Sequence, residues 1–63
     1  MKTYNKTSIL LVEEDLELRN TISESLNAVD YKVYAVRKSI ECLDYFKKYD
    51  IDVCILDVET TGI

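Results

Sequence analysis

The sequence predicts an α/β domain with a parallel sheet, built in the order β-α-β-α-β. Three short runs rich in Val, Ile, Leu or Tyr are spaced along the chain, and two segments with helical periodicity separate them. The chain has 63 residues, enough for at most one small domain. It contains no Pro and a single Gly, so no Pro- or Gly-rich linker divides it.

The first strand is expected at residues 8–12, Ser-Ile-Leu-Leu-Val, because a continuous apolar run is typical of a strand buried on both faces. The first helix is expected at 16–29, where apolar residues recur at spacings of four, four and three and so share one face. These residues are Leu18, Ile22, Leu26 and Val29. Asp15 can cap the start of this helix. Residues 27–30 can end it, because Asn and Asp tolerate the left-handed conformation.

The second strand is expected at residues 31–36, which are rich in β-branched and aromatic side chains. A second helix is expected at 39–49, with Ser39 as its cap and Lys47 and Lys48 in its last turn, where positive charge is favourable. Cys42, Leu43 and Phe46 mark its expected inward face.

The third strand is expected at residues 52–57, another apolar run that ends on an acid, Asp57. Two right-handed crossovers would connect the three strands, with one helix on each face of the sheet or both helices on one face. The first strand can then lie between the other two, in the order 2-1-3.

Acidic residues follow both the first and the third expected strand. Glu13 and Glu14 follow the first, and Asp57 ends the third. Neighbouring parallel strands bring their carboxyl ends to one edge, the edge where open α/β sheets bind ligands. Three carboxylates together repel one another unless a divalent cation lies among them, and oxygen ligands suit Mg²⁺. Each acid taken alone also fits a role in capping or solubility.

Composition excludes several classes of function. The net charge of −4 argues against non-specific binding to nucleic acid or anionic membranes. The longest apolar runs have four residues, so no segment spans a membrane and a cytoplasmic location is expected. His is absent, which excludes His-based general bases and the usual zinc sites. Cys42 and Cys54 lie in apolar patterns, so we expect two small buried hydrophobes and no disulfide or metal pair.

Together these motifs resemble the N-terminal half of a response-regulator receiver domain of two-component signalling. The resemblance runs from about Thr7 to Ile63. It is carried by residues 9–15, Ile-Leu-Leu-Val-Glu-Glu-Asp; by Leu18-Arg19; and by residues 55–58, Ile-Leu-Asp-Val, with Gly62-Ile63 after them. It implies a flavodoxin-like, three-layer receiver fold, of which residues 1–63 would form part.

The resemblance also implies roles for individual residues. Asp57 matches the phosphoacceptor, and Glu13 and Glu14 match the acidic pair that helps to bind Mg²⁺. Glu59 matches the position that offers its backbone carbonyl to the metal. The phosphoryl donor would be a histidine kinase or phosphotransfer protein. The domain would be a signalling module whose only chemistry is its own phosphorylation, and it would not be an enzyme in the ordinary sense.

The sequence departs from the family pattern in three places. Glu14 stands where the family usually has Asp, and Thr60-Thr61-Gly62 stands where it usually has Met-Pro-Gly. Family members also continue with two more strands and three more helices, which supply a Ser or Thr hydroxyl and a Lys to the phosphoryl group.

Two alternatives remain open. The chain could be an inert, truncated receiver that acts as a structural piece and self-associates through the exposed edge of its third strand. Residues 57–62, Asp-Val-Glu-Thr-Thr-Gly, are also similar to the first motif of DEDD-type exonucleases, in which Asp57 and Glu59 would hold metals.

Overall fold

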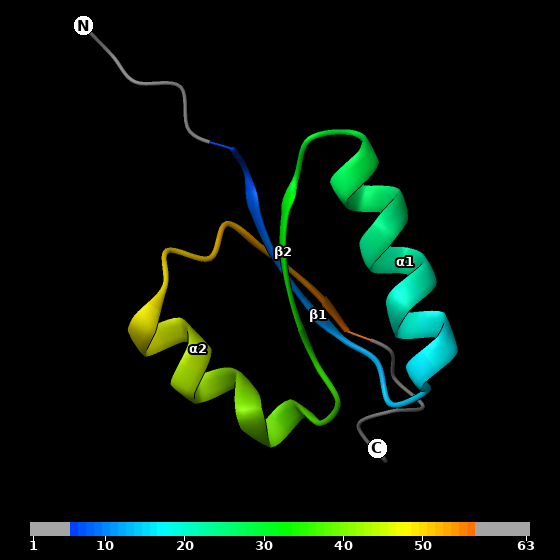
Figure 1. The fold of residues 1–63 in the computed structure, drawn as a ribbon. Coiled ribbons are helices and arrows are strands. Elements are labelled where there is room, and N and C mark those ends of the chain that lie inside the picture. The colour runs from blue at the N-terminus through cyan, green and yellow to red at the C-terminus, as the bar shows by residue number, and fades with distance from the viewer. Residues whose placement is uncertain (1–5, 57–63) are drawn as a thin grey trace, which may run out of the picture.

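The computed structural model describes residues 6–56 (Figure 1). Its elements are β1 (Ser8–Val12), α1 (Leu16–Ala28), β2 (Lys32–Val36), a 3-10 turn (Ser39–Glu41), α2 (Cys42–Lys48) and β3 (Val53–Leu56). Asp57 and Glu59 lie outside the described residues. No helix in the described range is long and apolar enough to cross a membrane.

The three strands form a parallel sheet in the order β2-β1-β3, as predicted. Strand β1 is central and pairs with a neighbour on each side. Leu10 pairs with Tyr34 and Cys54, and Val12 pairs with Val36 and Leu56. Side chains of paired residues point to the same face of a sheet, so this register decides which residues meet on each face.

The two helices cover opposite faces of the sheet. The chain moves outward in one direction from β1 to β2, and in the other direction from β2 to β3. Right-handed crossovers taken in opposite directions pass over opposite faces. Figure 1 shows α1 and α2 on the two sides of the strands, which decides between the two arrangements left open by the sequence.

The core is built around β1, where Ile9, Leu10, Leu11 and Val12 are all buried. Leu10 and Val12 point towards α2, and alternation along the strand directs Ile9 and Leu11 to the α1 face. On the α2 face the buried cluster consists of Leu10, Val12, Val36 and Cys42, with Tyr34, Tyr45 and Ile51 packed against it. A strand buried on both faces explains why its sequence is a continuous apolar run.

Helix α1 begins and ends through short-range signals in its sequence. Asp15 is the N-cap, and its carboxylate accepts a hydrogen bond of 3.0 Å from the Leu18 N–H. At the other end Asp30 has φ 73°, the left-handed conformation expected for this position. The N–H of Tyr31 donates to the Leu26 carbonyl and that of Asp30 to the Asn27 carbonyl, the pattern of a Schellman motif. Val29 is consequently the C-cap, and the helix ends at Ala28.

The second helical segment differs from the prediction in its start and in its buried face. Ser39 does not cap an α-helix but opens a 3-10 turn, where the Glu41 carboxylate accepts a hydrogen bond from the Lys38 N–H. Leu43 and Phe46 are exposed, so their assignment to the inward face is wrong.

A cluster of three tyrosines explains this orientation of α2. The Tyr34 ring from β2 stacks on Tyr49 at 4.3 Å between centroids and meets Tyr45 edge-on at 6.0 Å. These contacts direct Cys42 and Tyr45 towards the sheet, three positions apart on one helical face.

Strand β3 is not buried on both faces as its sequence suggested, because all four of its residues are exposed. Within the described residues β3 pairs only with β1 and is the outermost strand on that side. Cys54 is also exposed, which corrects its assignment as a buried hydrophobe, whereas Cys42 is buried as expected.

Candidate functional site

Glu13 lies at the carboxyl end of the central strand, where the sequence placed the candidate site. Its N–H donates a hydrogen bond of 3.0 Å to the Val36 carbonyl, which continues the pairing of β1 with β2 by one residue. Only 5% of Glu13 is exposed. One oxygen of its carboxylate accepts the Asp15 N–H at 3.1 Å. The strand and the start of α1 therefore hold this acid in a defined place.

The guanidinium of Arg19 holds the turn between β1 and α1. It donates a hydrogen bond of 2.9 Å to the Glu13 carbonyl and a longer one of 3.4 Å to the Glu14 carbonyl. Arg19 is half-buried and lies in the first turns of α1. A cation bound to two successive carbonyls fixes the backbone from which both acidic side chains project.

The three acids that follow β1 have different environments. Glu13 is buried, whereas Glu14 and Asp15 are exposed. The Asp15 carboxylate is engaged as the helix cap. The turn therefore presents one buried and two exposed acids at this edge, and the assignment of Glu13 and Glu14 to a metal stays a prediction.

The structure places Glu13 and Glu14 at the carboxyl-terminal edge of the sheet, and the other predicted site residues, Asp57 and Glu59, lie outside the described range. Leu56, the last described residue, pairs with Val12. Glu13 follows Val12 in the sequence and Asp57 follows Leu56, so the two acids come directly after paired residues of neighbouring strands. Within residues 6–56 there is no group of three Cys, Asp or Glu side chains placed to hold a metal ion.

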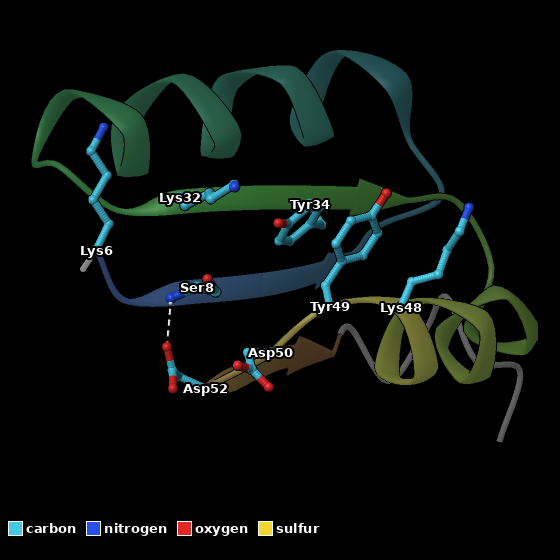
Figure 2. Close-up of a pocket in the computed structure, with 8 residues that line it drawn as sticks. All are labelled: Lys6, Ser8, Lys32, Tyr34, Lys48, Tyr49, Asp50 and Asp52. Atoms are coloured by element: carbon cyan, nitrogen blue, oxygen red, sulfur yellow. Dashed lines mark hydrogen bonds between the residues drawn. The ribbon is translucent and has the colours of Figure 1, made fainter. Parts of the chain in front are cut away.

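A hollow lies at the opposite, amino-terminal edge of the sheet, where Figure 2 shows its side chains. Its volume is about 560 Å³. It is lined by Lys6, Ser8, Lys32, Tyr34, Lys48, Tyr49, Asp50 and Asp52. No sequence pattern predicted it, because its residues come from strand starts and from the end of α2.

Several residues that line this hollow take part in contacts that stabilise the fold. The Asp52 carboxylate accepts a hydrogen bond of 2.8 Å from the Ser8 N–H, and the Asp52 N–H donates to the Ser8 carbonyl at 2.9 Å. These bonds tie the start of β3 to that of β1. Tyr34 and Tyr49 stack on one another, as Figure 2 shows. Open α/β sheets bind ligands at the carboxyl ends of their strands, so the edge at Glu13 is the stronger candidate.

Comparison with known proteins identifies relatives of the chain. The chain is 33% identical over 54 residues, 86% of its length, to the Aerobic respiration control protein ArcA of Escherichia coli strain K12, a response regulator. The proteins of the same name from strains O6:H1 and O157:H7 match equally well. The chain is homologous to a response regulator. Its parallel β-α-β-α-β arrangement, in the order 2-1-3, is that of the corresponding part of a flavodoxin-like receiver fold.

The homology covers only a small part of the length of the matched proteins. The chain spans 23% of the length of the curated proteins that it matches. No family model matches it, and no solved structure matches it significantly. The homology thus applies to a receiver-like stretch and not to the full length of those proteins.

Replacing Arg19 tests how much its hydrogen bonds to the turn between β1 and α1 stabilise the fold. We predict that Arg19→Met lowers the free energy of unfolding by about 1.5 kcal/mol, because a half-buried, charged hydrogen bond to the Glu13 carbonyl is lost. Arg37→Met is the matched control. Arg37 is exposed and makes none of the hydrogen bonds or ion pairs found in the described part, so this change should cost less than about 0.5 kcal/mol. Urea denaturation measures both values, and equal costs would contradict the role of Arg19.

Proposed function

We propose that residues 1–63 form part of a receiver domain in which Asp57 accepts a phosphoryl group from a histidine kinase or phosphotransfer protein, with Mg²⁺ bound nearby. The observation that carries this proposal is the position of Glu13. It is a buried acid held at the carboxyl end of β1, next to the strand that Asp57 follows in the sequence. The homology to a response regulator supports the same assignment.

The acids after β1 are of the kind that suits the proposed metal. Mg²⁺ prefers oxygen ligands and keeps several of its waters, so it needs only a few protein oxygens. Glu13 and Glu14 would supply carboxylates, and the Asp57 carboxylate and the Glu59 backbone carbonyl, which follow β3 in the sequence, would add to them. The bound ion would offset negative charge on the phosphoryl oxygens during transfer.

The chain's own residues would perform the remaining steps. The Asp57 carboxylate would attack phosphorus, and the bond from phosphorus to the donor's leaving group would break, leaving an aspartyl phosphate. Arg19 would keep Glu13 and Glu14 in place through their carbonyls. The chain would thus act as a phosphoacceptor and signalling module, with no turnover of an external substrate.

Incubation with acetyl phosphate and Mg²⁺, followed by intact-mass measurement, tests this proposal. We predict an adduct of one phosphoryl group that disappears in Asp57→Asn and when the metal is chelated. Asp50→Asn is the matched control, since this acid lies at the opposite edge of the sheet, and it should retain the adduct. An unmodified wild-type chain would favour an inert fragment. An adduct that persists in Asp57→Asn would show that the phosphoacceptor is assigned to the wrong residue.

A second candidate function, self-association, is favoured by the exposure of β3. Val53 and Leu56 are each 47% exposed and Ile55 is 38% exposed, although all three are apolar. Within the described range β3 has only β1 as a neighbour, so its other edge offers unpaired backbone groups. A second copy that pairs along this edge would cover both the backbone groups and the apolar side chains.

Analytical ultracentrifugation tests the association. The wild-type chain should form a dimer at micromolar concentration, and Ile55→Lys should weaken it by roughly tenfold or more, because a buried lysine opposes edge pairing. Ile40→Lys replaces a more exposed apolar side chain that is far from β3 in sequence, and it should leave the dimer intact. A wild-type monomer throughout the micromolar range would refute self-association without bearing on phosphorylation.

A further inference from the structure

The fold brings the only two cysteines of the chain to the same face of the sheet. Cys42 is the first residue of α2 and is buried in a cluster with Leu10. Cys54 lies in β3 and pairs with Leu10 in the register of the sheet. Since Leu10 points towards α2, its partner Cys54 points to that face as well. Leu10 is therefore the common neighbour of the two thiols.

The two side chains also interact directly. Burial raises the pKa of the Cys42 thiol, and the neighbouring Cys54 raises it further through charge and a thiol hydrogen bond. Both cysteines are free thiols, with Cys42 buried and Cys54 exposed. One member of the pair can thus be reached from solvent, while the other is shielded behind it.

We propose that Cys42 and Cys54 are a redox-active dithiol that closes to a reversible disulfide between the start of α2 and β3. Three features support this. The two thiols share Leu10 as a neighbour on one face of the sheet, and the exposed one is accessible to an oxidant. Among the described strands β3 is outermost on its side, so a small shift towards α2 meets little packing resistance. The proposal is independent of phosphorylation at Asp57.

A small-molecule disulfide such as oxidised glutathione can act as the oxidant. The exposed Cys54 loses its proton, and its thiolate attacks one glutathione sulfur, forming a mixed disulfide and releasing one glutathione thiolate. Cys42 then loses its proton and attacks the Cys54 sulfur, and the second glutathione leaves. Each leaving thiolate takes up one proton. Two protein thiols are oxidised to one disulfide, and one glutathione disulfide is reduced to two thiols.

This bond would connect α2 to β3, two elements that otherwise have few contacts with one another. It would close the segment 42–54, which contains α2 and the start of β3. Such a loop removes conformations from the unfolded chain and so favours the folded state. The oxidised form should keep β3 attached more firmly than the reduced form does.

Oxidation of the full chain with glutathione disulfide at mildly alkaline pH tests the proposal. The expected main product is a monomer lighter by two hydrogen atoms, with Cys42 and Cys54 linked in the peptide map. Its thermal midpoint should rise by roughly 10 °C and return to the original value on reduction. A stable glutathione adduct, or a dimer linked through Cys54, as the main product would overturn the proposal. So would a midpoint that stays unchanged or falls on oxidation.

Two single variants separate the roles of the thiols. Cys42→Ser retains the exposed thiol without its partner, so the mixed disulfide with glutathione should accumulate. Cys54→Ser retains only the buried thiol, which should react roughly tenfold more slowly. If Cys42→Ser accumulates no adduct, or if the two variants react equally fast, the assigned order of attack is wrong and the proposal fails.

Discussion

The parallel pairing of β1 with a strand on each side is the constraint on which the rest of the structure depends. It buries Ile9 to Val12 on both faces and forces the two crossover helices onto opposite sides of the sheet. It also sets the register that brings Val12 opposite Leu56 and Leu10 opposite Cys54. Both the candidate phosphorylation site and the cysteine pair follow from that one register. A slip by one residue would turn each of these side chains to the other face.

The site at the end of β1 combines a rigid part and an accessible part. Glu13 is buried and bonded to the start of α1, while Glu14 is exposed beside it. Arg19 binds the carbonyls of both, so the backbone of the turn is held while the Glu14 side chain is accessible to solvent. Glu14 has one more methylene than the Asp usual in receivers, and an exposed position lets the longer side chain bend towards a cation. We therefore expect that the substitution changes the geometry of metal binding more than it disturbs the fold.

The sequence was a good guide where a short-range signal decides the structure. The apolar run at Ile9, the cap at Asp15 and the left-handed end at Asp30 were all predictable, because each depends on neighbours within a few residues. It was a poor guide where contacts between distant residues decide. Tyr34 sets the orientation of α2 and leaves Leu43 exposed, and no periodicity within residues 39–49 reveals a tyrosine on another strand. The sequence analysis expected no pair of Cys42 and Cys54, because their shared neighbour Leu10 depends on the register of β3 with β1. The contacts of Arg19 with the Glu13 and Glu14 carbonyls depend on the folded turn in the same way.

On our proposal Glu13 and Glu14 form one metal site with Asp57. The most direct test is a titration of the ¹⁵N-labelled chain with Mg²⁺, observed by NMR through the backbone amides, with NaCl at matched ionic strength as the control. We predict saturable shifts at Glu13 and Glu14 that are absent with NaCl and much weaker in Asp57→Asn. Shifts of equal size in Asp57→Asn, or no response of the Glu13 and Glu14 amides to Mg²⁺, would contradict a shared metal site.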